Sequence, residues 1–126
     1  MAQPRGQPSE AGVLRGEIWW GKPALAGGSR KRRPFLVVSN DAFNRNDRYP
    51  KTMAVHLTSV RRIGDEYPWE VCLSKGEGGL PSSSVAKCGE IYTLRKSQLD
   101  RKVGTLTAQR MNAVDRALAL SLGLRA

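Results

Sequence analysis

The sequence has few of the residues that build metal centres and disulfide frameworks. It contains one histidine, His56, and two cysteines, Cys72 and Cys88, which lie far apart in the chain. Zinc sites need three or four ligands at characteristic spacings, and disulfides are rare in cytosolic proteins. We therefore expect no metal and no other cofactor, and we expect both cysteines to be reduced core thiols.

Long apolar runs and acidic residues are also scarce. No stretch approaches the ~18 apolar residues of a membrane-spanning helix, and the amino terminus lacks the apolar core of a signal peptide. Lys and Arg number 21 against 11 Asp and Glu, a net charge of +10. An excess of this size predicts a polyanionic partner. The cations are spread over loops, which disfavours a membrane surface and favours nucleic acid or an acidic protein in the cytoplasm.

The length of 126 residues fits one domain with a modest core. Residues 1–12 are rich in Pro, Gln and Gly and are predicted to be a disordered leader, followed by a single folded domain over 13–126. Short apolar and alternating segments predict about seven strands, over 14–20, 33–39, 52–58, 67–73, 84–87, 90–94 and 103–105. Many short strands joined by glycine-rich turns predict a mainly β fold, a small barrel.

Helical spacing predicts one clear helix, over 106–122. Met111, Val114, Leu118 and Leu122 repeat at the spacing of a buried face, while Asn112, Asp115 and Arg116 fall on the opposite side. Thr107 is the expected N-cap, and Gly123 ends the helix. A shorter helix, capped by Ser39 or Asn40, is expected to run through Asn44, and a helical turn near 97–100.

The stretch 31–40 joins a cation cluster to a buried strand. Lys31, Arg32 and Arg33 lead directly into an apolar run that begins at Phe35. Pro34 favours an extended backbone at Arg33, so this guanidinium is expected at the rim of a rigid element, where it could bind a phosphate. A solvated loop end explains the same charges equally well.

The strand over 52–58 carries polar groups on one face. Alternation places Met53, Val55 and Leu57 on one side and Thr52, Ala54, His56 and Thr58 on the other. Thr58 and Ser59 at the strand end could deliver hydroxyls into a cleft. Strand threonines are, however, common for their β-propensity alone, and a lone strand histidine is usually a hydrogen-bonded structural residue.

Six segments occur in the order found in one protein family. They are Arg15-Gly16-Glu17-Ile18-Trp19, the run from Arg32 to Asp41, Val55-His56-Leu57-Thr58-Ser59, Ser84-Val85-Ala86, Cys88-Gly89-Glu90-Ile91-Tyr92-Thr93-Leu94, and the helix with Val114-Asp115-Arg116-Ala117-Leu118 and Leu122-Gly123-Leu124. Together they resemble the MazF/PemK (Kid-like) toxins of bacterial toxin–antitoxin pairs. The resemblance runs from about Leu14 to the end of the chain.

The resemblance implies an SH3-like barrel of the PemK/CcdB type, usually a homodimer. It implies a metal-independent endoribonuclease that cuts single-stranded RNA and is inhibited by an acidic antitoxin. The family's catalytic Arg, which precedes Pro on the second strand, falls on Arg33. Its catalytic Thr falls on Thr58, with Ser59 beside it. Six cations are expected to bind RNA phosphates: Lys22, Arg30, Lys31, Arg32, Arg61 and Lys87.

The chain departs from the family pattern at two positions that bear on acid–base chemistry. The loop before Arg33 reads Gly28-Ser29-Arg30-Lys31, where many members carry a Glu. Many members also have an acid directly after the position of Cys88, where this chain has Gly89 and then Glu90. The sequence therefore does not identify the general base. His56 is a weak candidate, because strand spacing sets it one pleat away from Thr58.

Two other functions stay open from the sequence, besides a catalytically inactive homologue that still binds an antitoxin, which the loop without the family Glu would allow. A gyrase-poisoning toxin of the same fold is one, although that lineage typically ends in Trp-Gly-Ile and this chain ends Gly123-Leu124-Arg125-Ala126. A non-catalytic basic barrel that only binds RNA is the other. It would keep the positive charge and have no need for Arg33 and Thr58 together.

Overall fold

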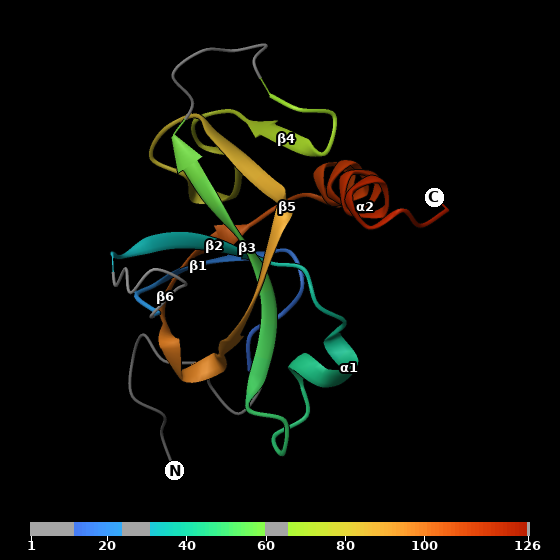
Figure 1. The fold of residues 1–126 in the computed structure, drawn as a ribbon. Helices are drawn as coiled ribbons and strands as arrows, with labels where there is room; N and C mark the ends of the chain where they lie inside the picture. The colour runs from blue at the N-terminus through green and yellow to red at the C-terminus, as the bar shows by residue number, and fades with distance from the viewer. Residues whose placement is uncertain (1–11, 24–30, 60–65, 126) are drawn as a thin grey trace.

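The computed structural model describes residues 12–23, 31–59 and 66–125. Residues 1–11 of the expected leader over 1–12, and the expected RNA-binding residues Arg30 and Arg61, lie outside this part. Figure 1 shows the order of the elements along the chain, which are β1 (Glu17–Gly21), β2 (Arg33–Val37), α1 (Asp41–Asn44), β3 (Lys51–Ser59), β4 (Glu70–Leu73), η1 (Glu77–Gly79), β5 (Ser84–Arg95), η2 (Lys96–Gln98), β6 (Leu99–Thr105) and α2 (Ala108–Leu122).

The described strands form one antiparallel sheet in the order β4-β5-β3-β2-β1-β6. The expected mainly β fold with a C-terminal helix is confirmed. The sheet has six strands where seven were predicted, because the predicted strands over 84–87 and 90–94 are one element, β5. Gly89 does not end this strand. It lies among residues 87–90, where the pairing of β5 with β3 is irregular, and β5 bends along its length (Figure 1).

The ladder of hydrogen bonds does not close into a complete barrel. β4 and β6 are the two edges of the sheet, and η1, in the connection after β4, lies against β6. Gly104 in β6 approaches η1 so closely that a Cβ there would overlap the backbone of Gly78. Glu77 of η1 also accepts a 2.6 Å bond from Arg110 of α2. Side-chain and loop contacts, rather than strand pairing, therefore connect the two edges.

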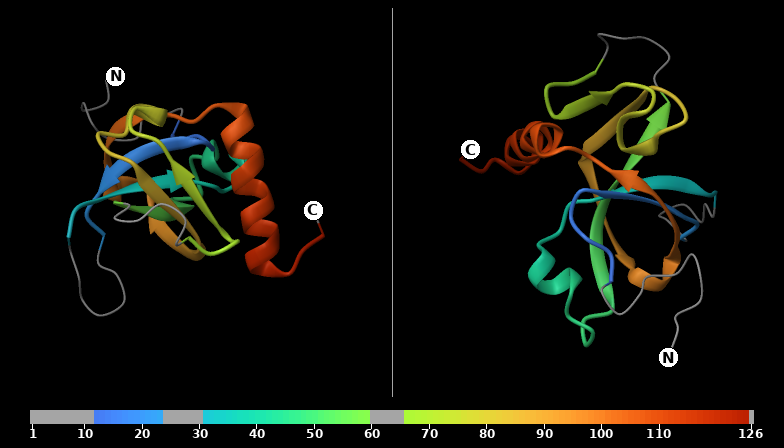
Figure 2. Two further views of the ribbon diagram at one scale, coloured as in Figure 1. Left: turned by 90° about the horizontal axis from the view of Figure 1, so that it is seen from above. Right: turned by 180° about the vertical axis from the view of Figure 1, so that it is seen from behind.

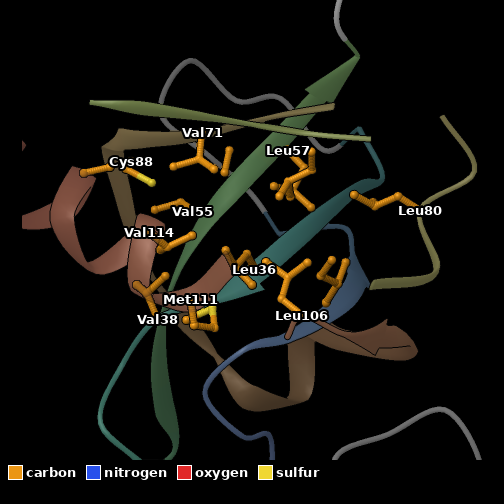
Figure 3. Close-up of a cluster of buried hydrophobic side chains, with 14 residues drawn as sticks. Leu36, Val38, Val55, Leu57, Val71, Leu80, Cys88, Leu106, Met111 and Val114 are labelled. Atoms are coloured by element: carbon orange, nitrogen blue, oxygen red, sulfur yellow. The ribbon is translucent and has the colours of Figure 1, made fainter. Parts of the chain in front are cut away.

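One face of the sheet packs against α2 (Figure 3). Met111, Val114 and Ala117 of the helix are buried among strand residues that include Leu36 and Val55. Thr107 caps the helix, as predicted, by accepting from the Arg110 amide, and Gly123 ends it in the left-handed conformation. Burial of this face supplies most of the stability of the helix.

The buried face of α2 does not extend as far as the sequence pattern predicted. Leu118 is only partly buried, and Leu122 is 58% exposed, so the prediction that Leu122 is core is wrong. The last turn of α2 still contacts β5, because the Ser121 hydroxyl donates to the Cys88 carbonyl at 2.9 Å. Leu122 is on the exposed side of this turn, and the chain after α2 leads away from the sheet (Figure 2). Among the described residues, no helix is long and apolar enough to cross a membrane.

A second apolar cluster lies on the other face of the sheet. It contains Val13, Trp19, Phe35, Val37, Ala54, Leu94 and Leu99, with Tyr92 packed against it. Trp19 is buried in this cluster. Trp20 is half-buried, and the guanidinium of Arg32 lies 5.6 Å from its ring centre.

Buried polar contacts fix the turn from β2 to β3. Asn40 caps α1 by accepting from the Ala42 amide at 2.7 Å. The side-chain oxygen of Asn44 accepts from the Ser39 and Thr52 hydroxyls at 2.6 and 2.8 Å. Because buried polar groups are costly unless they are paired, this network sets where β3 begins.

Both cysteines are free thiols. Cys88 is buried near the bend of β5, and this burial raises the pKa of its thiol to about 12. Cys72 in β4 is half-buried, and desolvation raises its pKa as well. Raised pKa values keep both thiols protonated near neutral pH, so neither is an activated nucleophile.

Candidate active site

Strands β2 and β3 bring Arg33, His56 and Thr58 onto one face of the sheet. Phe35 lies directly opposite His56 in the antiparallel register. Side chains alternate along a strand, so Arg33, two residues before Phe35, shares the face of His56. The pairing of β2 with β3 ends at Phe35 and His56, and Arg33 and Thr58 each lie two residues beyond it, at the same end of the two strands. This is the face of the second apolar cluster, and the three polar residues lie at its edge.

Arg33 has no carboxylate partner among the described residues. Its terminal Nη1 lies 3.4 Å from Nδ1 of His56. Its Nε is buried and has no hydrogen-bond partner within the described part of the chain. Two neighbouring cations differ in this respect, since Arg32 pairs with Asp100 and Lys87 with Glu70. No neighbour in the described part of the chain therefore neutralises the positive charge of Arg33.

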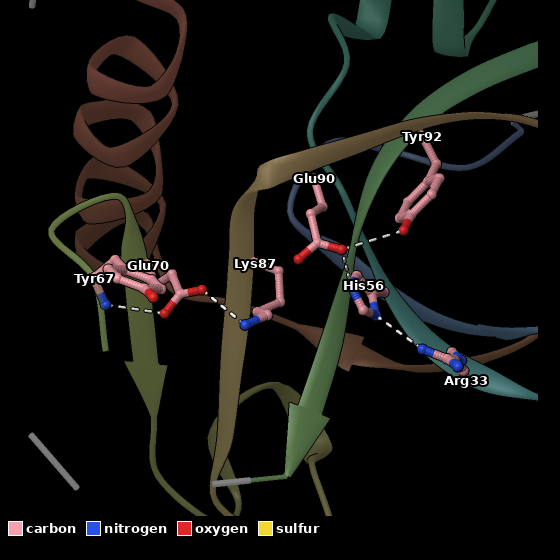
Figure 4. A network of polar contacts seen from close by, with 7 residues as sticks. All are labelled: Arg33, His56, Tyr67, Glu70, Lys87, Glu90 and Tyr92. Atoms are coloured by element: carbon pink, nitrogen blue, oxygen red, sulfur yellow. Dashed lines mark hydrogen bonds and ion pairs between the residues drawn. The ribbon is translucent and has the colours of Figure 1, made fainter. Parts of the chain in front are cut away.

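His56 is buried and is hydrogen-bonded through both ring nitrogens. Its Nδ1 faces Arg33, and its Nε2 lies 3.1 Å from Oε1 of Glu90 (Figure 4). The ring also makes an edge contact with Tyr92, at 5.5 Å between centres. Burial is the main cause that lowers the pKa of His56 from 6.5, and the charges of Arg33 and Lys87 act in the same direction. The bond to Glu90 opposes this shift without reversing it.

Glu90 reaches His56 because β5 bulges at this point. Val55 pairs with Ile91 and Leu57 pairs with Ala86, so the single residue His56 lies opposite residues 87–90. The bulge directs the Glu90 carboxylate toward both His56 and the Tyr92 hydroxyl, which donates at 3.4 Å. The sequence showed only an acid next to Gly89. No sequence signal places that acid on His56, because an irregularity of the ladder creates the contact.

The other predicted site residues that the structure describes lie elsewhere, on β3, β5 and the loops next to β1 and β2. Ser59 is exposed at the end of β3, where it pairs with Ser84. Lys22 and Lys31 are exposed. Lys87 donates to Glu70 at 2.9 Å, and this bond is the main cause that raises its pKa.

The described residues contain no group of three or more His, Cys, Asp or Glu side chains that could hold a metal ion.

The described surface does carry several large apolar side chains beyond the sheet core. Tyr67 and Trp69 are stacked in parallel 4.9 Å apart, and Leu120, Leu122 and Leu124 are more than half exposed.

Comparison with known proteins identifies the family. Residues 14–122 match the family described as the PemK-like, MazF-like toxin of type II toxin–antitoxin systems. The chain belongs to this family. The resemblance drawn from the six segments of sequence is thereby confirmed.

Relatives within the PemK/MazF family match over nearly their whole length. Endoribonuclease MazF2 of Mycobacterium bovis is 35% identical over 114 residues, which cover 89% of this chain and 98% of the relative. Endoribonuclease MazF9 of Mycobacterium tuberculosis is 32% identical over 115 residues, covering 89% and 98%.

Solved structures agree with these sequence matches. A mycobacterial endoribonuclease in complex with its cognate antitoxin is 32% identical, with a TM-score of 0.72 over 90% of this chain and 98% of that one. A MazE–MazF structure from Deinococcus radiodurans is 26% identical, with a TM-score of 0.65 over 88% and 95%.

Proposed function

We propose that this chain is the toxin of a type II toxin–antitoxin system and a sequence-specific endoribonuclease that acts on single-stranded RNA. Its relatives are named endoribonucleases. The observation that carries the proposal for this chain is the position of Arg33, a half-buried guanidinium without a carboxylate partner in the described structure, on the face that also carries Thr58.

The reaction needs little from the protein, because RNA supplies its own nucleophile. The 2′-hydroxyl loses its proton and attacks the adjacent phosphorus, and the bond to the 5′-oxygen breaks. The products are a 2′,3′-cyclic phosphate and a 5′-hydroxyl. Negative charge grows on the non-bridging oxygens during this step, and a positioned cation that binds them more tightly in the transition state accelerates the reaction.

Arg33 and Thr58 take the roles that this chemistry requires. The guanidinium of Arg33 can donate two parallel hydrogen bonds to the phosphoryl oxygens. The Thr58 hydroxyl can donate one more from the neighbouring strand, and Ser59 lies beside it at the strand end. Exposed Lys22, Lys31 and Arg32, together with Arg30, Arg61 and Lys87, bind flanking phosphates and set the affinity rather than the rate.

The test is cleavage of a synthetic single-stranded RNA by purified wild type and Arg33→Ala. Loss of one positioned donor costs roughly a hundredfold in rate, so we expect Arg33→Ala to cut at least that much slower with an unchanged melting temperature. The reaction is run in EDTA, and the ends are examined for a cyclic phosphate and a 5′-hydroxyl. RNA binding without cleavage by the wild type would favour the non-catalytic barrel instead.

We also propose a cytoplasmic homodimer that binds an acidic antitoxin. The net charge of +10 suits an acidic partner, and the exposed apolar residues near the end of α2 offer a surface for a second copy. Light scattering of the purified chain distinguishes a dimer from a monomer. A supercoiling assay with gyrase tests the remaining alternative, which predicts inhibition where the endoribonuclease predicts none.

A further inference from the structure

His56 and Glu90 form a chain of contacts that ends on Arg33. Oε1 of Glu90 lies 3.1 Å from Nε2 of His56, and Nδ1 of His56 lies 3.4 Å from Nη1 of Arg33. Figure 4 shows the three side chains in line across β5, β3 and β2. Because His56 is only 5% exposed, its ring has little freedom to turn away from either neighbour.

The chemistry of the two neighbours determines which ring nitrogen carries the proton. A guanidinium has only donors, so the nitrogen that faces Arg33 must offer a lone pair. The ionised carboxylate of Glu90 has only acceptors, so the nitrogen that faces it must carry the hydrogen. One neutral tautomer, protonated on Nε2, satisfies both contacts, whereas a doubly protonated ring would set a donor against Arg33.

We propose that Glu90 and His56 are positioning residues: Glu90 selects the tautomer of His56 that is protonated on Nε2, and the Nδ1 lone pair then holds the guanidinium of Arg33 in place without neutralising it. A carboxylate in the position of His56 would hold Arg33 more tightly but would also cancel its charge. A neutral acceptor leaves the full charge available for a phosphate. In this arrangement His56 takes no proton from RNA.

The surroundings of His56 support a neutral ring. The charged and titratable groups that face it are Arg33 from β2 and Lys87, Glu90 and Tyr92 from β5. Burial lowers the pKa of His56, and the two cations act with burial against the single carboxylate. The ring is therefore neutral at neutral pH, as the contact with Arg33 requires.

The first test observes the tautomer directly. His56 is the only histidine in the chain, so the untagged protein labelled with nitrogen-15 histidine gives one pair of ring nitrogen signals. We expect a protonated Nε2 and an unprotonated Nδ1 in the wild type and in Arg33→Leu, where Glu90 alone selects the tautomer, and a mixture in the Arg33→Leu/Glu90→Leu double variant, where neither neighbour selects it. A proton on Nδ1 in the wild type at neutral pH, or the same tautomer in the double variant as in Arg33→Leu, would overturn the proposal.

The second test separates positioning from proton transfer and rests on the proposed function. In His56→Asn the amide oxygen replaces the acceptor at Nδ1, whereas His56→Leu removes it at similar volume. We expect His56→Asn to cut within about threefold of the wild-type rate. The fall in the wild-type rate at low pH, where His56 becomes protonated, should be absent in this variant. We expect His56→Leu to cut about tenfold to a hundredfold slower, since a small misplacement of a catalytic group has effects of this size.

An equal loss of cleavage rate in both His56 variants would show that His56 acts as a base and would contradict the positioning role. Glu77→Gln serves as the control, because it breaks an ion pair with Arg110 that lies outside this network. If the wild type cuts no RNA, the proposed function fails, and the tautomer measurement still decides whether Glu90 and His56 are arranged as we infer.

Discussion

At the level of single residues, the partner of each cation determines what its charge can do. Arg110 is paired with Glu77 near the surface, and a pair of this kind is worth little, about 0–1 kcal/mol. Lys87 is paired with the largely buried side chain of Glu70 and would have to exchange this partner for a phosphate in order to bind RNA. Arg33 contacts a neutral nitrogen instead, so its charge is left for a ligand, although its Nε, buried without a partner in the described part of the chain, costs stability.

The lowered pKa of His56 predicts how stability depends on pH. The folded chain binds a proton at His56 less readily than the unfolded chain, so the free energy of unfolding should fall as the pH drops below 6.5 and through the folded pKa. The other resolved shifts in the described part belong to groups that titrate outside this range, such as Glu77 and Cys88. Urea unfolding between about pH 7.5 and about pH 5.5 measures the slope.

His56→Gln is the matched variant for this measurement, because it keeps polar contacts but has no titrating ring. Its unfolding free energy should be nearly flat over the same pH range. An equal slope in wild type and variant would assign the effect to another group.

From the sequence, strand alternation predicts which site residues share a face of the sheet, but not which of them are in contact. The grouping of His56 and Thr58 on one face follows from a period of two, and Pro34 marked the rigid position of Arg33. The contact of Glu90 with His56 could not be predicted, because it depends on the irregular register of β5 against β3. The pairing of Arg32 with Asp100 joins residues distant in sequence and carries no local signal.

At the level of elements, the ends of a helix could be predicted from its capping residues, whereas a glycine was a poor guide to the end of a strand. Thr107 and Gly123 define the ends of α2 by well-known chemistry, and both were predicted. The predicted strands over 84–87 and 90–94 leave a gap that includes Gly89, yet β5 continues through it. The reason is local packing, since Trp69 lies against Gly89 where a Cβ would otherwise sit. A glycine can therefore mark a bend under a neighbouring side chain rather than an end.

The cap of α2 gives a prediction at this level. Thr107→Ala removes the acceptor for the Arg110 amide and should lower the free energy of unfolding by about 1 kcal/mol. Thr107→Ser keeps the hydroxyl and should stay within a few tenths of a kcal/mol of the wild type. Urea unfolding at neutral pH compares the three proteins. A serine variant as unstable as the alanine variant would mean that the cap is not the source of the loss.

At the level of the whole molecule, positive charge should govern affinity for RNA. Each phosphate contact with a single strand releases a counterion and adds about 0.7 to the slope of log affinity against log salt. If Arg30 and Lys31 bind phosphates, the double alanine variant should have a slope smaller by about 1.4. Fluorescence anisotropy with a labelled, non-cleavable RNA at several salt concentrations measures it.

The matched control removes the same charge elsewhere. Arg45 and Arg48 are exposed in the segment that leads into β3, at the opposite end of this strand from Thr58. Alanine at both positions should leave the slope nearly unchanged. A loss as large as that of the Arg30/Lys31 variant would mean that net charge, rather than position, sets the affinity.

The open ladder between β4 and β6 has a consequence for behaviour at high concentration. Unpaired strand edges invite other chains to add on and start fibrils. Here the β6 edge carries Asp100, Arg101 and Lys102 in succession, and β4 is only four residues long. Charged and short edges resist such growth, so this small sheet can stay incomplete without becoming a seed for aggregation.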